Sequence, residues 1–174
     1  MTEPSANALV TALATGQPGA YAVLYDRVGP ILLRVARVML GAADQAEDAV
    51  QDVFVELVRQ RDRLGRVVDL DAYLFAMLRH GVWRRLKRHS AEQEHLRRLQ
   101  RVRPAATSDP EPSCADELSL ALKTLPAEQR EVIALKIDAD LTFAQIADIL
   151  GVNPNTAASR YRYALEKFRR ILEP

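Results

Sequence analysis

Apolar residues recur at intervals of three and four along almost the whole chain, and this periodicity limits the fold more than any other feature. Alternating apolar and polar runs, which a half-buried strand would need, are almost absent. The 174 residues include only seven glycines, so few positions favour sharp turns. The sequence therefore predicts an all-α fold.

Helical patterns fill the N-terminal half. The first runs from Pro18 to about Leu40, with a kink or break expected at Gly29-Pro30. The second covers 44–61, where Val50, Val53, Phe54 and Leu57 share one face. A polar loop follows, and Asp69 or Asp71 is expected to cap a third helix that continues into the basic run "RRLKRH".

A proline-rich segment divides the chain. "RPAATSDPEPS", residues 103–113, contains three prolines and no helical period, which is typical of a linker. Further helical patterns follow at about 115–124, 127–137 and 142–150, with a last helix after them. We expect two small helical domains, 1–100 and 115–174, joined by a linker at 101–114.

Composition narrows the class of protein. The net charge of +1 means that any basic surface must be local, and a single cysteine excludes an internal disulfide and fits a reducing compartment. No apolar run is long enough to span a membrane, and the N-terminus lacks the basic start of a signal peptide, so we expect a cytoplasmic protein.

The stretch "DILGVNPNTAASRYRYALEKFRR" (148–170) joins two helices across a very short turn. Gly151 suits the left-handed end of one helix, while Asn153 and Pro154 suit the start of the next. The exposed side of the last helix then carries small polar residues and an arginine in its N-terminal half, as in DNA-recognition helices. The alternative is an ordinary helix hairpin with a solvated basic face.

The region from Arg79 to Arg103 holds nine Arg or Lys residues against two acidic ones. Tyr73 and Trp83 lie nearby in the sequence. Cations that follow phosphates and rings that stack on bases suit single-stranded or melted nucleic acid. The alternative places Trp83 in the core and leaves the charges merely solvated.

Carboxylates stand at successive i+4 positions of the second helix, at Asp44, Asp48, Asp52 and Glu56. Like charges at this spacing repel each other, by about 0.2–0.5 kcal/mol per pair. Such a stripe indicates a surface for a cationic partner. No histidine interleaves the carboxylates, and the sequence has no nucleophile elbow or phosphate-binding glycine loop. We therefore expect no metal, no cofactor and no enzymatic activity.

Motifs in order along the chain resemble the extracytoplasmic-function sigma factors of bacterial RNA polymerase. "QAEDAVQDVFVELV" is similar to that family's acidic helix, and "LDAYLFAMLRHGVWRRLKR" is similar to its promoter-melting helix. The segment from "LPAEQREV" to "LEKFRR" is close to its promoter-binding helix-turn-helix domain. The motifs occur in the family's order, with a proline-rich linker before the last. The resemblance covers roughly residues 17–90 and 115–172.

The resemblance implies partners and site residues. The partners are core RNA polymerase and promoter DNA, with an anti-sigma factor as a further candidate and no membrane insertion. Docking on the clamp of the largest polymerase subunit would use Asp44, Glu47, Asp48, Gln51, Asp52 and Val55. The minus-ten element would contact Arg63, Arg66, Tyr73, Arg79, His80, Trp83, Arg84 and Arg88. The minus-thirty-five element would contact Asn155, Thr156, Ala158, Ser159, Arg160, Arg162, Tyr163 and Lys167.

Several positions depart from the family pattern. His80, Arg84 and Tyr73 stand where the family usually has Asn, Asp and Trp, and Ala158 occupies a position often held by Lys. Two alternatives stay open at this point. One is a sigma-like binding protein without promoter activity, and the other is a helix-turn-helix repressor whose N-terminal domain senses a ligand or dimerises.

Overall fold

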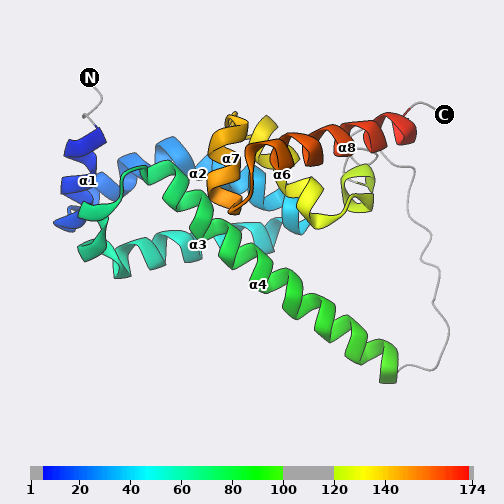
Figure 1. Cartoon of the computed structure of the whole chain (residues 1–174). Helices are drawn as coiled ribbons and strands as arrows, with labels where there is room; N and C mark the ends of the chain where they lie inside the picture. Colours follow the sequence, from blue (N-terminus) through cyan, green and yellow to red (C-terminus); the bar gives the residue numbers. More distant parts are fainter. Residues whose placement is uncertain (1–5, 100–119, 173–174) are drawn as a thin grey trace.

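The computed structural model describes residues 6–99 and 120–172, and within these ranges it contains helices and no strand (Figure 1). The predicted all-α fold is confirmed. The helices are α1 (Ala6–Ala14), α2 (Pro18–Leu40), α3 (Ala43–Arg59), the 3₁₀ helix η1 (Arg61–Arg66), α4 (Leu70–Leu99), α6 (Ala127–Ile137), α7 (Phe143–Leu150) and α8 (Pro154–Leu172). Residues 120–124 are also helical.

The long helices α2, α3 and α4 pack around one core. α2 continues through Pro30 without interruption, so the expected break is absent. Leu24, Leu32, Leu57 and Leu74 are fully buried in this core. Asp69 is the residue that caps α4, because its Oδ1 accepts a hydrogen bond from the Ala72 amide at 2.9 Å.

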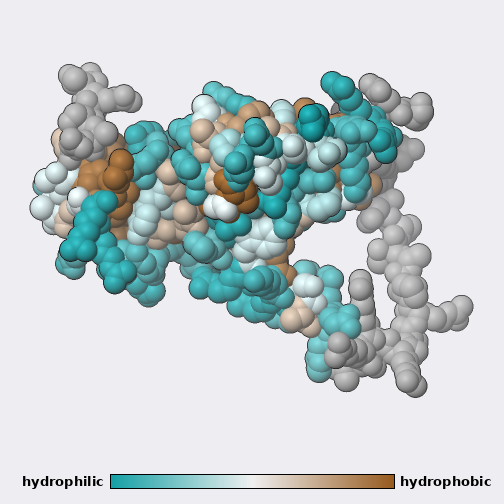
Figure 2. All heavy atoms as spheres, in the orientation of Figure 1, coloured by the Kyte–Doolittle hydropathy of each residue, from teal (hydrophilic) through white to brown (hydrophobic). Residues whose placement is uncertain are grey.

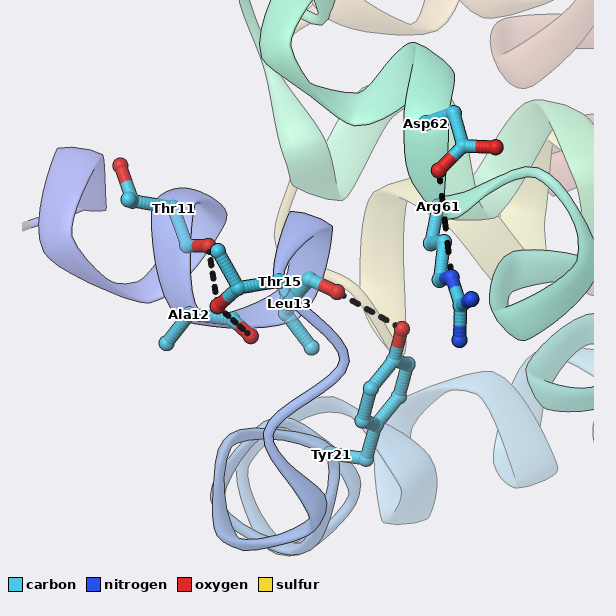
Figure 3. A network of polar contacts seen from close by, with 7 residues as sticks. All are labelled: Thr11, Ala12, Leu13, Thr15, Tyr21, Arg61 and Asp62. Atoms are coloured by element: carbon cyan, nitrogen blue, oxygen red, sulfur yellow. Dashed lines mark hydrogen bonds and ion pairs between the residues drawn. The ribbon is translucent and has the colours of Figure 1, made fainter.

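The first helix, α1, was not expected from the sequence, since its single turn-spaced pair of leucines is a weak signal. Leu9 and Leu13 are buried, and α1 packs against η1 and α2. Figure 3 shows how its end is held: the Tyr21 hydroxyl donates to the Leu13 carbonyl at 2.9 Å, and Thr15 Oγ1 bonds back to the Thr11 carbonyl at 3.0 Å. α1 therefore closes one end of the N-terminal bundle.

The helices after the linker form a smaller unit. Leu125, Ile133 and Ala164 form a buried cluster of their own, with Tyr161 and Phe168 packed against it. The predicted helix from 127 to 137 is confirmed as α6, and the predicted helix from 142 to 150 as α7. The linker placed at 101–114 lies outside the described residues.

The two halves of the chain share a core. α6 lies along α2, and α7 lies against α4 (Figure 1). Leu135 of α6 and Leu150 of α7 belong to the same buried cluster as Val35 and Leu78 of the N-terminal half. Separate periodic segments predict separate domains, but they do not predict that the domains pack on each other.

The last turns of α4 differ from the rest of that helix. They extend away from the other helices in Figure 1, and residues 87–96 are exposed. Their surface is largely hydrophilic in Figure 2. This part of α4 is therefore exposed, although Arg88, His89 and Glu92 border a hollow beside α3.

Candidate nucleic-acid interface

The start of α8 is built by local backbone chemistry. Thr142 and Gln145 form a reciprocal capping box at the start of α7, and Gly151 ends that helix with φ 66°. Asn153 Oδ1 then accepts a hydrogen bond from the Asn155 amide at 2.9 Å. The turn that joins the two helices is thus the one that the sequence predicts.

One face of α8 packs inward. Ala157 and Ala164 are buried, and the Tyr161 ring lies 5.6 Å from the Phe143 ring of α7. Among the predicted minus-thirty-five residues, Ala158, Ser159 and Arg160 are half-buried. The others, Asn155, Thr156, Arg162, Tyr163 and Lys167, are exposed. The N-terminal half of α8 therefore offers a polar, accessible surface.

The cations of this surface differ in whether another residue of the protein holds them. Arg160 pairs with Glu128 at 3.0 Å, and the Lys167 ammonium donates to the Thr124 carbonyl at 2.7 Å. Both would have to leave these partners to bind phosphate. The Arg162 guanidinium lies over the Tyr163 ring at 5.5 Å, and the Arg162 side chain is exposed.

The structure divides the predicted minus-ten residues into two groups. Arg63, Arg66, His80, Arg84 and Arg88 are exposed. Tyr73 is half-buried, and its hydroxyl donates to Gln60 Oε1 at 2.6 Å. At 100° per residue, Tyr73, His80, Arg84 and Arg88 follow one side of α4.

Arg79 and Trp83 lie on a different side of α4 and face α6. The Trp83 indole N–H donates to Glu131 Oε1 at 2.9 Å, and Arg79 Nε lies 3.1 Å from the same oxygen. Burial raises the pKa of Glu131, although the hydrogen bond from Trp83 and the nearby charges of Arg79 and Arg160 oppose that rise. Arg79 and Trp83 are therefore half-buried against α6 in this arrangement.

An open hollow lies beside the loop that follows η1. It has a volume of about 890 Å³ and lies between α1 and residues 65–71. Apolar side chains such as Val10 and Val67 line it, together with polar groups such as Thr15 and Asp69. Val68 at its border is fully exposed. Figure 2 shows apolar side chains gathered at this end of the molecule.

The acidic stripe on α3 is accessible along its length. Every predicted polymerase-binding residue, Asp44, Glu47, Asp48, Gln51, Asp52 and Val55, is exposed. The stripe is only partly uncompensated, which corrects the sequence-based interpretation. Asp52 pairs with Arg85 of α4 at 2.6 Å, and Glu47 pairs with Arg37 of α2 at 3.3 Å. Within 6–99 and 120–172, Asp44 and Asp48 make no ion pair.

Sequence reasoning missed two residues that organise these surfaces. Arg85 neutralises part of the acidic stripe, and Glu131 joins α6 to α4. Arg85 was one cation in a basic run, and Glu131 was one acid in the helix predicted at 127–137. Neither carried a signal, because each acquires its partner only from another helix.

Two negative findings apply to the described residues. They hold no group of three or more His, Cys, Asp or Glu side chains arranged to bind a metal ion. None of their helices is long and apolar enough to cross a membrane.

Comparison with known families matches both halves of the chain. Residues 24–92 match Sigma-70 region 2, and residues 115–168 match Sigma-70 region 4. The chain belongs to the extracytoplasmic-function sigma factors. This sigma factor binds core RNA polymerase and promoter DNA and directs promoter recognition in transcription initiation.

Relatives of this sigma factor match over nearly their whole length. It is 28% identical to the "ECF RNA polymerase sigma factor SigL" of Mycobacterium tuberculosis, over 95% of this chain and 96% of that protein. It is 25% identical to the "RNA polymerase sigma factor CarQ" of Myxococcus xanthus, over 90% of this chain and 91% of that protein.

Solved structures share its fold. The sigma factor RpoE, in complex with the anti-sigma factor NepR from Bartonella quintana, aligns with a TM-score of 0.72 at 24% identity over 88% of this chain and 96% of that chain. CnrH, in complex with the cytosolic domain of CnrY, aligns with a TM-score of 0.73 at 24% identity over 96% of each chain.

Proposed function

We propose that this sigma factor divides its work among three surfaces: α3 for polymerase, α4 with η1 for the minus-ten element, and α8 for the minus-thirty-five element. The domains proposed to carry them are 1–100 and 115–174, joined at 101–114. The observation that carries the proposal is that the predicted residues on all three surfaces, apart from Arg79 and Trp83, have side chains within reach of a partner.

For α3, the support is electrostatic. Asp44 and Asp48 are exposed, have no ion pair within the described residues and lie one helical turn apart. Val55 is 49% exposed on the same face, so the surface combines charge with apolar area. Such a surface suits a partner that supplies cations around an apolar contact, as the clamp of the largest polymerase subunit would.

For the minus-ten element, the support is a cationic face beside a hollow. His80, Arg84 and Arg88 are exposed on α4, and Arg63 and Arg66 are exposed on η1. The hollow between α1 and residues 65–71 offers an apolar lining with polar groups at its edge. Cations can follow the phosphates of a melted strand while a base that has left the stack enters the hollow.

For the minus-thirty-five element, the support is the exposed N-terminal half of α8. Asn155 and Arg162 have the donors that base edges in the major groove require. The free amides at the start of the helix favour a phosphate nearby. The capped turn at Gly151 holds α8 in the orientation in which this half projects.

The proposal also covers where the protein acts and which partners it has. We infer that it acts in the cytoplasm by binding alone, with no chemistry or cofactor of its own. RpoE and CnrH were solved with protein partners, and an anti-sigma factor is a candidate partner here too. The repressor alternative is disfavoured, because a repressor needs no Sigma-70 region 2 domain.

Run-off transcription with purified core polymerase tests the proposal, on the region upstream of the protein's own gene. We expect a transcript with the wild-type chain, a weaker one with Asp44→Asn/Asp48→Asn, and a weaker one with Arg84→Ala/Arg88→Ala. Replacing Asp26, an exposed α2 residue outside all three surfaces, with Asn should leave the transcript unchanged. Copurification with core polymerase but no transcript at any concentration would identify a sigma-like binding protein instead.

A further inference from the structure

A buried carboxylate lies between the two domains. Glu131 is only 3% exposed, and apolar side chains surround it, including Val35 of α2 and Val82 of α4. The void left beside these residues is about 10 Å³, so the interface is nearly filled. Glu131 is the buried charged residue among those that the structure describes.

The hydrogen bonding of this carboxylate is only half complete. Oε1 accepts from Trp83 and contacts Arg79, whereas Oε2 has no hydrogen-bond partner among the described residues. A buried carboxylate needs nearly all of its acceptor sites filled to offset the loss of water. The raised pKa of Glu131 reflects the same imbalance. The Oε1 contacts of Glu131 therefore fix how α6 packs on α4. Its unfilled Oε2 makes the same packing less stable.

The arrangement also brings the proposed promoter-binding surfaces close together. Glu131 contacts α4 through Arg79, and Glu128, one turn earlier on α6, contacts α8 through Arg160. α4 and α8 are therefore separated by little more than one helix, about 10–12 Å. The minus-ten and minus-thirty-five elements are roughly 25 base pairs apart, or about 85 Å at 3.4 Å per base pair. The closed arrangement cannot engage both elements at once.

We propose that Glu131 sets the balance between this closed arrangement and an open one in which α6 has left α4. Its contacts with Trp83 and Arg79 select the closed packing, and its unfilled acceptor keeps that packing easy to open. The functional consequence of opening rests on the proposed function, because opening would let α4 and α8 reach separate promoter elements. The balance itself is a property of the free protein.

The test measures the distance between the domains in the full chain. Cysteines at Asp26 and Glu166, both exposed, carry spin labels in a Cys114→Ser background. Glu131→Lys places a cation against Arg79 and should shift the closed-to-open ratio toward open by about tenfold or more. Glu131→Gln still accepts from Trp83 without a buried charge and should be at least as closed as the wild type.

Controls separate this effect from charge and from misfolding. Asp148→Lys makes the same charge change on an exposed site of α7 and should leave the distance unchanged. Trp83→Phe keeps an aromatic ring of smaller size and removes the N–H donor, so it should open the chain in part even if Glu131→Lys fails to fold. An unchanged distance in both Glu131→Lys and Trp83→Phe, or an opening of the same size in Asp148→Lys, overturns the proposal.

Transcription separates this proposal from the proposed function. If Glu131→Lys opens the chain while the wild type directs no run-off transcript, the closed–open balance stands and the functional assignment fails. If the wild type is active while the distance never responds at position 131, the assignment stands and the balance does not depend on Glu131.

Discussion

Arginines on α8 illustrate how position decides the role of a side chain. Arg162 lies in the N-terminal half of the helix, on the same face as Asn155, whereas Arg169 lies two turns later, and both are exposed. Only the N-terminal half of a recognition helix reaches base edges. The two arginines are therefore a matched pair for testing base reading against phosphate binding.

We predict that Arg162→Ala costs about 1–3 kcal/mol at the preferred minus-thirty-five sequence and relaxes specificity there. Arg169→Ala should weaken all duplexes alike and lower the salt slope by about one unit. The measurement is binding of the full chain to promoter duplexes across a salt series. If Arg162→Ala weakens every duplex equally, Arg162 is a phosphate contact and its assignment to base edges is wrong.

Gly151 and Gly19, each at a helix end, differ in backbone conformation, but both have open space around the position of a β-carbon. Gly151 has φ 66°, and no atom lies within 4 Å of a β-carbon added there. We predict that Gly151→Ala lowers the free energy of unfolding by about 1–2 kcal/mol, because an L-residue is strained in the left-handed region. Gly19, in the first turn of α2, has equally open space and no positive φ, so Gly19→Ala should be neutral or stabilising. Urea unfolding measures both, and equal losses would contradict the argument.

At the scale of an element, α3 combines two kinds of carboxylate. Asp48 is exposed without an ion pair in the described residues, and Asp52 pairs with Arg85 of α4. The first kind makes no ion pair among the described residues, whereas the second links two helices. Their stability effects should therefore differ even though their sequence positions are equivalent.

We predict that Asp48→Asn leaves the melting temperature unchanged or slightly raised and weakens binding to core polymerase. Asp52→Asn should weaken binding as well, but at a cost of about 0–1 kcal/mol in stability, because an exposed ion pair is lost. Thermal unfolding and copurification with core polymerase provide the two readouts. A large loss of stability from Asp48→Asn with intact polymerase binding would make the stripe a fold determinant.

At the scale of the whole molecule, carboxylates at the domain interface make the packing of the two domains depend on pH. Burial raises the pKa of Glu131, which faces Arg79 and Trp83 of α4 and Arg160 of α8. Burial also raises the pKa of Asp138, which faces Arg34 of α2 and is opposed by that charge. Both groups hold a proton more tightly in the closed arrangement than they would in water.

The sign of the pH dependence follows from these shifts. A group whose pKa is raised in the closed state favours that state at low pH, and the contribution is lost as the pH rises through the raised value. We predict that the closed fraction grows as the pH falls from neutral into the acidic range in which these carboxyl groups take up a proton. The label distance measures it, and Glu131→Gln should remove part of the response and leave the part from Asp138. A closed fraction that grows with rising pH would contradict the prediction.

Much of this protein could be predicted from the sequence alone. Helices α2, α3, α6, α7 and α8 begin and end close to the predicted residues, because apolar spacing and caps such as Thr142 and Gly151 act within a few residues of themselves. The exposed faces of α3 and α8 followed from the same periodicity. The helix α1 was missed because its two buried leucines are too few to form a pattern.

Only the tertiary structure decided which charges find partners and which faces of a helix stay free. Periodicity left the facing of Trp83 open, and the family resemblance placed Arg79 and Trp83 among the minus-ten residues. In the structure α6 packs against that side of α4 and brings Glu131 to them. Arg85 and Asp52 likewise meet only because α3 and α4 pack together. Local propensity acts over a turn or two of helix. The contact between Trp83 and Glu131 joins residues that are 48 positions apart, so only the packing of the two domains could determine it.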